Sequence, residues 1–553
     1  MDSSEEHERM DSSEEIEAAT GHDGRLPSVS AALSPHGIVE SSHRWSASDS
    51  SHERAISYAH RQGMLPAILA RAWRALVTSR YQLLEKQLTL AEHRLSDLPI
   101  GHIHKYRVQI DTLRACELIA MDESLAALSV VSGVYRSAAN VTIPAAAITI
   151  YRLGYWRLGD IDRFYAIERP SLPACPTRSQ VRQHVYDLSL EAAVELEHLR
   201  FPMAKRLAQG ALDAAVNASA AKQCEASLPA SILAEIYYEE GDIARAEDLL
   251  RDRFCKIRKS GLIDCAIRTY ATAGRIAALR GQLRYMSLLL HDAEMLGEER
   301  RWPRLVAAAI AERLNLLAKL GCIAEAQDCL LRLRRVSLHR HMADGYARGE
   351  IIRLTLLSEG RFALAKGQWH DAIRDLTSLE STLDFRDETR SSFQTRLALV
   401  SALFGAGREE AAMDILLKLL RIGAAAGLYQ SFVDAGPVVS EALVRILADA
   451  ARIDGALFSG GRPFITSIIE AAHSSKKDTT PADLDIRFPK TMTRKEIDVM
   501  TYMGTGLSNK RIAQALSISP ETVKSHIKNI FTKLSVATRQ EAVARARALG
   551  MIA

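Results

Sequence analysis

The chain has 553 residues, of which 47% are hydrophobic, 6% aromatic and 25% charged, with a net charge of +4. This length implies several domains or one long array, and the apolar content is ample for a buried core. No apolar run approaches the ~20 residues that a membrane-crossing helix needs, and the acidic N-terminus does not resemble a signal peptide. We therefore expect a cytoplasmic protein with no membrane partner. The seven cysteines include no Cys-x-x-Cys pair, which predicts free thiols.

The first 52 residues differ from the rest of the chain. They contain eleven acidic residues, three Lys or Arg and thirteen serines, with little apolar periodicity. A segment with this composition cannot bury enough apolar surface to offset the entropy of ordering. We expect residues 1–52 to be a disordered acidic tail.

From about residue 55 to 470, a short motif recurs in which a glycine is followed five residues later by alanine or a bulkier apolar residue. Successive glycines from Gly241 onward are separated by 40, 40, 46 and 40 residues, and the gap from Gly159 to Gly241 is 82. That gap equals two periods, which places a turn without glycine near Arg200. The same spacing, extended toward the N-terminus, predicts earlier turns near Arg80 and Met121.

This periodicity predicts stacked pairs of helices. An apolar helix precedes each glycine, the glycine permits a tight turn, and the small residue after it lets the returning helix pack closely. One pair cannot bury its own apolar face, but stacked neighbours can. Tyr155 and Tyr237, each four residues before its glycine, fit the packing tyrosine of tetratricopeptide repeats, which the array resembles with a longer period. The predicted fold class is all-α: a helical-repeat solenoid followed by a small helical domain.

Candidate chemical groups in the array are few. The two His-x-His pairs, 102/104 and 339/341, cannot share a metal ion on a helix, because residues two apart point in different directions. The acidic pairs 239–240 and 298–299 are interpreted as solvated helix ends. The basic cluster from Arg332 to Arg340 is interpreted as a solvated face, with an anionic effector or the DNA backbone as the alternative. No motif predicts catalysis, a metal or a cofactor.

Residues 471–490 contain Ser474, Ser475, Lys476, Lys477 and Pro481 and are predicted to be a flexible linker. Residues 491–553 then carry signals for four helices. Thr493 with Glu496, and Thr538 with Glu541, have the spacing of capping boxes. A three-residue turn at 517–519 joins the second and third helices. The expected N-caps are Thr493, Ser508, Ser519 and Thr538, and the expected glycine stops are Gly506 and Gly550.

The third of these helices begins at Pro520 and has two faces. Its apolar residues are spaced by four, three and four positions and form one stripe: Val523, Ile527, Ile530 and Leu534. The polar residues Thr522, Ser525, Lys528 and Asn529 lie away from this stripe. Short polar side chains mixed with lysines on an outward-facing helix are suited to a DNA major groove, although a solvated face has the same composition.

Two further features favour DNA. Ser508, Asn509, Lys510 and Arg511 place free amides and two cations at the start of the second helix, which suits a phosphate. Residues 491–553 also hold ten Lys or Arg against four Asp or Glu, an excess larger than the net charge of the whole chain.

The segment resembles the C-terminal helix-turn-helix of LuxR-type transcription regulators over roughly 60 residues. The matching runs are 492–496 (Met-Thr-Arg-Lys-Glu), 506–510 (Gly-Leu-Ser-Asn-Lys), 512–513, 522–526 (Thr-Val-Lys-Ser-His), 533–534, Arg539 and 541–542. The resemblance implies that Lys524, Ser525 and Lys528 approach bases. The phosphate-contacting or supporting residues would be Ser508, Asn509, Lys510, Thr522, Asn529 and Arg539. In the family, the fourth helix commonly supports dimerisation, here around Ala542, Ala546 and Leu549; packing within the domain is the alternative.

Lengthened repeats ahead of such a domain are similar to the central and C-terminal parts of MalT-like regulators. Those proteins normally carry an ATP-binding loop of the form Gly-x-x-x-x-Gly-Lys-Ser/Thr, and this sequence contains no Gly-Lys dipeptide. We therefore do not expect ATP-driven oligomerisation.

The sequence thus predicts a regulator that binds double-stranded DNA as a homodimer and senses an effector or protein partner through its repeats. The alternative is a helical-repeat interaction scaffold with a vestigial helix-turn-helix.

Overall fold

The computed structural model describes residues 65–96, 100–137, 142–217, 224–338, 345–382, 389–448, 461–474, 494–534, 536 and 538–548. Throughout these ranges the chain is α-helical apart from turns, the irregular segment 167–177 and one 3₁₀ turn at Cys224–Ala226, and no β-strand occurs among them. The predicted all-α fold class is confirmed. None of the helices in these ranges is both long and apolar enough to cross a membrane. The predicted tail, residues 1–52, lies outside the described residues.

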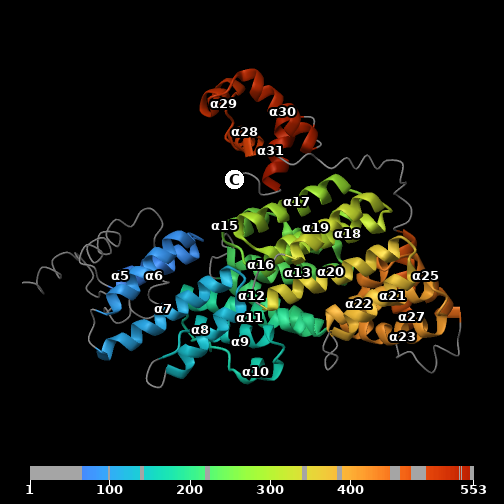
Figure 1. Cartoon of the computed structure of the whole chain (residues 1–553), viewed down its shortest axis with the longest axis horizontal. Helices are drawn as coiled ribbons and strands as arrows, with labels where there is room; N and C mark the ends of the chain where they lie inside the picture. The colour runs from blue at the N-terminus through green and yellow to red at the C-terminus, as the bar shows by residue number, and fades with distance from the viewer. Residues whose placement is uncertain are drawn as a thin grey trace, which may run out of the picture. The chain divides into compact units, whose positions relative to one another are not determined.

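Most helices come in consecutive pairs, and most of these helices are labelled in Figure 1. The first helices of the pairs are α5 (Leu65–Val77), α7 (Ile100–Ala120), α9 (Ala145–Arg157), α11 (Arg178–Glu197), α13 (Ser227–Glu239), α16 (Ile263–Leu279), α18 (Pro303–Lys319), α20 (Gly345–Ala365) and α22 (Arg390–Gly405). The second helices are α6 (Tyr81–Leu95), α8 (Ser124–Ser137), α10 (Ile161–Ala166), α12 (Phe201–Asn217), α14 (Ile243–Leu250) with α15 (Phe254–Ser260), α17 (Leu283–Arg300), α19 (Ile323–Leu338), α21 (Trp369–Thr382) and α23 (Glu409–Ala426).

Three more helices end the array: α24 (Tyr429–Asp434), α25 (Pro437–Ala448) and α27 (Gly461–Ser474). The first four residues of the predicted linker are therefore helical, and its remaining residues lie outside the described ranges. The chain divides into two compact units. One comprises residues up to 114 with segments 134–144 and 172–181, and the other comprises 115–133, 145–171 and 182 onward.

The turn between the two helices of these pairs contains a residue in the left-handed conformation, close to the position that the repeat period predicts. The six predicted glycines, at 159, 241, 281, 321, 367 and 407, have φ between 68° and 83°. At Gly321 the geometry is typical: the amide of Cys322 donates to the carbonyl of Leu317 at 2.9 Å, closing the end of α18. The three turns predicted without glycine are also present, with left-handed Ser79, Asp122 and Leu199.

The residue five positions after each of these turn residues is fully buried. At 0% exposure stand Leu84, Ala127, Phe164, Ala204, Ala246, Met286, Ala326, Ala372 and Ala412. Small side chains dominate this set, so the second helix of a pair lies close to the first. The predicted packing role of the motif is confirmed, including at the turns that lack glycine.

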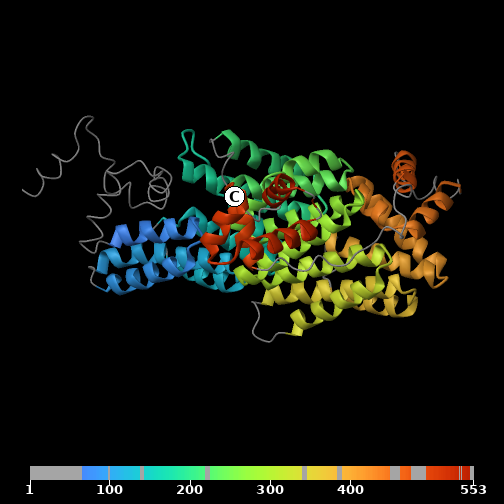
Figure 2. The same cartoon turned by 90° about the horizontal axis from the view of Figure 1, so that it is seen from above.

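From α13 to α22, neighbouring pairs stack through their first helices. The helix α18 packs against its partner α19 and against α16, α17 and α20, and α20 packs in turn against α21 and α22. Figure 2 shows the green and yellow helices of this stretch lying side by side. Tyr237 is half-buried, with the Lys205 ammonium 4.5 Å from its ring centroid.

Polar contacts join repeats that are far apart in the sequence. Side chains separated by 182 to 196 positions meet, more than four repeat periods. The Arg304 guanidinium bonds to Asp122 at 2.7 Å and to Asp264 at 2.8 Å, while Tyr238 donates to Asp434 at 2.8 Å. These contacts fix non-neighbouring repeats against one another.

The structure contradicts one interpretation of the sequence, which concerns Glu239. Glu239 was expected at a solvated helix end, but it is only 2% exposed. Its carboxylate accepts from Arg390 at 3.0 Å and from the Ser431 hydroxyl at 2.8 Å. The partners come from helices some 150 to 190 positions further along, which helical spacing within α13 does not reveal. Glu240, by contrast, is exposed and pairs with Lys205 at 2.6 Å.

Six of the seven cysteines follow the prediction of free thiols. Cys116, Cys175, Cys255, Cys265, Cys322 and Cys329 are all free thiols. Burial raises the pKa of Cys265 to about 11, so this thiol stays protonated at neutral pH.

Candidate nucleic-acid interface

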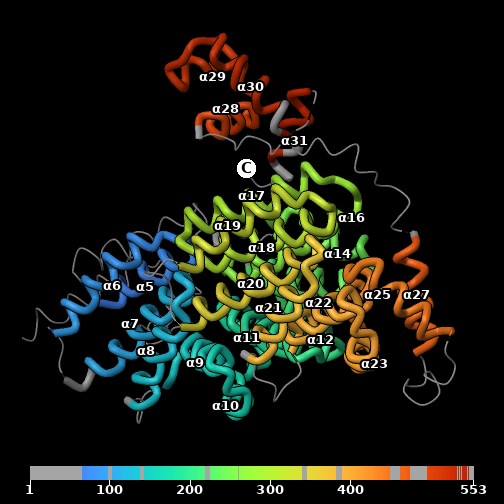
Figure 3. Tube along the Cα trace, turned by 45° about the vertical axis from the view of Figure 1, so that its right-hand side comes forward, coloured from blue at the N-terminus to red at the C-terminus, as the bar shows by residue number. Residues whose placement is uncertain are grey.

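Four short helices form a small bundle after the array: α28 (Arg494–Gly504), α29 (Asn509–Leu516), α30 (Pro520–Leu534) and α31 (Arg539–Ala548), drawn in red in Figure 3. The helix α30 packs against the other three. Buried apolar residues from all four make the core: Val499, Met500, Met503, Ile512, Ala513, Val523, Ile530, Leu534, Ala542 and Ala546. Thr493, the expected first N-cap, lies outside the described residues.

The turn between α28 and α29 forms at the predicted glycine. Gly506 is left-handed, with φ 81°, and the Leu507 amide donates to the carbonyl of Tyr502 at 3.2 Å. Ser508 occupies the N-cap position of α29, but its hydroxyl makes no capping hydrogen bond. The expectation of a hydroxyl cap at Ser508 is therefore wrong, and the Ser508 side chain is exposed.

The turn between α29 and α30 is tight and well capped. Ser517 takes a left-handed conformation with φ 53°, and the Ile518 amide donates to Ala513 at 3.0 Å. The Ser519 hydroxyl accepts from the Thr522 amide at 3.1 Å, and Pro520 is the first helical residue. The predicted cap and turn are confirmed, and they fix the direction in which α30 leaves α29.

The two predicted faces of α30 are both present. Val523, Ile530 and Leu534 are fully buried, and Ile527 is half-buried. The exposed residues of the helix include five predicted site residues, which are Thr522, Lys524, Ser525, Lys528 and Asn529. The structure therefore brings the proposed base-reading side chains together on one solvent-facing helix surface.

One contact on this surface was not foreseen. The Lys524 ammonium lies 2.7 Å from the carboxylate of Glu521, one turn earlier on α30. Both side chains are mostly exposed, at 60% and 78%, so the pair contributes at most about 1 kcal/mol. Lys524 can therefore exchange Glu521 for a DNA acceptor at little cost. The spacing of three between an acid and a lysine could have indicated this pair.

The start of α29 presents the predicted phosphate-binding group. Ser508 and Lys510 are exposed and Asn509 is half-buried. The side-chain oxygen of Asn509 accepts from the Arg539 guanidinium at 3.1 Å, and a second guanidinium nitrogen of Arg539 donates to the Leu507 carbonyl at 2.6 Å. Arg539 thus braces the α28–α29 turn from α31, and desolvation lowers the pKa of its guanidinium. Of the two expected roles for Arg539, these contacts represent the supporting one.

The fourth helix begins with the predicted capping box. The Thr538 hydroxyl accepts from the Glu541 amide at 3.2 Å, while the Glu541 carboxylate accepts from the Thr538 amide at 3.3 Å. Ala542 and Ala546, expected near a dimer surface, are fully buried. These two alanines therefore match the alternative of packing inside the domain. Leu549 and Gly550 lie outside the described residues.

Two further features of the sequence are the His-x-His pairs and the basic cluster from Arg332 to Arg340. Within the described ranges, no group of three or more His, Cys, Asp or Glu residues could hold a metal ion. Arg332 pairs with Glu294, and Arg334 lies 2.6 Å from Glu359, so at least two of the five basic residues of this cluster are neutralised. His339 and Arg340 lie outside the described residues.

The C-terminal bundle and the repeat array before it each match a known family. Residues 490–546 match the family described as bacterial regulatory proteins, luxR family, and residues 176–449 match the MalT-like tetratricopeptide region. The C-terminal bundle is thus a LuxR-type helix-turn-helix domain, and it follows a MalT-like repeat region.

Similar proteins include several regulators. The chain is 53% identical over 51 residues to an uncharacterized transcriptional regulatory protein, YhcZ, of Bacillus subtilis, covering 9% of this chain and 24% of the relative. It is 50% identical over 48 residues to the nitrate/nitrite response regulator NarP of Escherichia coli, covering 9% and 22%. It is 40% identical over 58 residues to the regulator MalT of Vibrio campbellii, covering 10% and 6%. The chain therefore spans only a small part of each of these relatives.

Proposed function

We propose that this protein is a regulator of transcription that binds double-stranded DNA in a sequence-specific manner through α30. The observation that carries the proposal is that α30 has two different faces. Its apolar face is buried in the domain core, and five polar or cationic side chains on the helix face solvent. A helix anchored in this way offers a surface that fits the major groove. The names of the regulators to which residues of this domain are similar support the same function.

Within this proposal, Lys524, Ser525 and Lys528 contact base edges. Lysine donates to guanine O6 or N7, and a serine hydroxyl donates to or accepts from several bases. Ser508 and Lys510 contact phosphate at the start of α29, where helix amides and the exposed Ser508 hydroxyl offer donors. Thr522 and Asn529 flank the base contacts.

Supporting residues fix the positions of these DNA-contacting groups relative to one another. Arg539 holds the backbone before α29 and the side chain of Asn509, so the phosphate-binding group keeps a fixed position relative to α30. We further propose that two copies bind successive major grooves of an inverted-repeat site. The repeat array in this scheme receives an effector or a protein partner.

The test compares Lys528→Ala with Lys495→Ala in the full-length protein. Each variant removes one exposed lysine charge from the same domain, but Lys495 lies on α28 and outside the proposed contact set. At fixed salt, Lys528→Ala should weaken binding to the selected site by ~1–3 kcal/mol and relax one base position. Lys495→Ala should leave the base preference unchanged.

Two other results would redirect the proposal. An equal loss on every DNA sequence would assign Lys528 to phosphate rather than to a base. Failure of the wild-type protein to prefer any DNA sequence would favour the interaction scaffold with a vestigial helix-turn-helix.

A further inference from the structure

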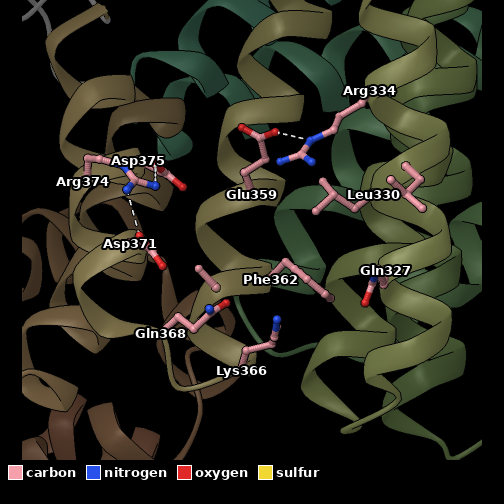
Figure 4. A pocket seen from close by; sticks show the side chains of 12 residues that line it. Gln327, Leu330, Arg334, Glu359, Phe362, Lys366, Gln368, Asp371, Arg374 and Asp375 are labelled. Carbon is pink, nitrogen blue, oxygen red and sulfur yellow. Dashed lines mark hydrogen bonds and ion pairs between the residues drawn. The ribbon is translucent and has the colours of Figure 1, made fainter.

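A groove opens in the repeat array between α19, α20 and α21, with a volume of about 290 Å³ (Figure 4). Its residues come from two consecutive pairs, and α19 and α20 both contribute to the floor. The turn that follows α20 contributes the Gln368 side chain. The volume lies at the lower end of the range for small-molecule sites, which suits a ligand of metabolite size.

The floor of the groove is apolar. Leu330 and Phe362 are buried at 5% and 8% exposure, whereas Leu331 remains 45% exposed at the edge. An apolar group placed here would remove the Leu331 side chain from water, which favours binding. The floor alone would accept any apolar ligand.

Most charges around the groove are already neutralised by neighbours. Arg334 lies 2.6 Å from Glu359, and Arg374 lies 2.8 Å from Asp371 and 2.9 Å from Asp375. In Figure 4 the Arg334–Glu359 pair lies above Phe362, and the Arg374–Asp371 pair lies to its left. These groups leave no uncompensated cation, and the Arg374 group, with its two carboxylates, keeps one negative charge in excess.

Lys366 is the exception on this rim. It forms no ion pair within the described part of the chain, and its ammonium lies 5.7 Å from the ring centroid of Phe362. In Figure 4 the ammonium points toward Phe362, with Gln327 and Gln368 on either side. A lysine in this position can meet a carboxylate or phosphate, and the two side-chain amides can donate further hydrogen bonds.

We propose that this groove binds a small amphipathic anion. Its carboxylate or phosphate would pair with Lys366, and its apolar body would cover Phe362 and Leu331. This inference deepens the proposed function, because it assigns the array's effector a site and a chemical class. By contrast, Arg304 and Arg390 of the inner contacts are each held by two carboxylates, so neither offers an anion a comparable free partner.

The test titrates three ring compounds into the full-length protein at fixed pH and ionic strength, with ligand-observed NMR as the readout. Phenylacetate and phenyl phosphate carry the two anionic groups, and phenylacetamide is the neutral counterpart. Both acids should bind saturably, and at least one should bind about tenfold more tightly than the amide, because a charge-assisted contact is added. The stronger acid indicates whether the groove prefers a carboxylate or a phosphate.

Lys366→Gln should abolish the preference for the acids while the amide still binds. The matched control is Lys418→Gln, which removes an exposed lysine from α23, outside the groove, and should keep the preference. Leu331→Ser should weaken acid and amide alike, since it changes the apolar wall. Absence of saturable acid binding, equal binding of acid and amide, or an unchanged preference in Lys366→Gln would overturn the proposal.

These titrations contain no DNA, so their outcome is independent of the DNA-binding test. If the acids bind through Lys366 but no DNA sequence is preferred, the groove stands and the regulatory role fails. If DNA is selected but the acids do not bind, the regulatory role stands and this site fails.

Discussion

Some ionisable side chains in the array are buried, and burial disfavours their charged form. Asp187 on α11 is one of them. It is fully buried, and its carboxylate accepts a hydrogen bond from Thr149. Its second oxygen has no hydrogen-bond partner within the described residues. Desolvation outweighs the hydrogen bond and raises the pKa of Asp187 to about 6. The folded protein therefore holds this proton more tightly than the unfolded chain does.

This shift predicts a stability change with a definite sign. Between an unfolded pKa near 4 and the folded value of about 6, the free energy of unfolding should fall as pH rises. Asp187→Asn removes the titration, so the variant should be more stable than wild type by ~1–3 kcal/mol at pH 7.5, with the gain shrinking toward pH 4. Urea unfolding at several pH values measures this. A gain that is independent of pH would contradict the assigned titration.

Arg539 illustrates a residue that acts through its neighbours. Its two hydrogen bonds need the forked guanidinium, which lysine lacks. Arg539→Lys should therefore weaken binding to every DNA sequence by a similar factor and destabilise the domain by ~1–3 kcal/mol, despite keeping the charge. DNA titration together with thermal unfolding would check this. Wild-type behaviour of the lysine variant would instead indicate a phosphate contact that needs only charge.

At the scale of elements, each helix pair depends on a left-handed residue in the turn that joins its two helices. Gly407 has φ 74°, and an added Cβ would meet no atom within 4 Å. Gly349 lies inside α20 and is equally free of neighbours, but its φ is not positive. Any effect of alanine at these two positions thus arises from backbone conformation alone.

Alanine should therefore have opposite effects at the two glycines. Gly407→Ala should destabilise the protein by ~1–2 kcal/mol, because a Cβ strains the left-handed conformation. Gly349→Ala should stabilise it by roughly 0.5–1 kcal/mol, since alanine favours the helix. Chemical unfolding of both variants provides the comparison. Equal signs would contradict the account of the turns.

Elements of this kind were the most predictable part of the chain. The turn at Leu199 was expected from phase alone, and the cap at Ser519 from residue type, because both depend on local sequence. The two faces of α30 follow from helical spacing in the same way. The Arg539 brace joins α31 to the start of α29, and the family resemblance named the residue without giving its partners. The groove at Lys366 depends on three helices meeting, which no single segment specifies.

At the scale of the whole molecule, the inner ion pairs lie beyond sequence reasoning. Arg304 and Asp122 are 182 positions apart, and only the stacking of intervening repeats brings them together. Desolvation alone would lower the pKa of Arg304, but the carboxylates of Asp264 and Asp122 outweigh it and raise that pKa. This arginine stays charged and holds two carboxylates in the interior.

Removal of Arg304 should therefore be costly. Arg304→Ala leaves Asp122 buried without its cation and should lower the free energy of unfolding by ~3–5 kcal/mol. The control Arg445→Ala breaks an exposed pair with Glu409, whose side chains are 60% and 64% exposed, and should cost about 1 kcal/mol or less. Similar losses in the two variants would show that the inner contacts do not hold distant repeats together.

The central claim is that α30 selects a DNA sequence. Its most direct test is the selection of genomic DNA fragments by the full-length protein at physiological salt, beside Lys528→Ala. The account predicts that the wild-type protein enriches one inverted-repeat motif and that the variant loses discrimination at one position in each half-site. Enrichment of no motif by the wild-type protein, or of an identical motif by the variant, would contradict it.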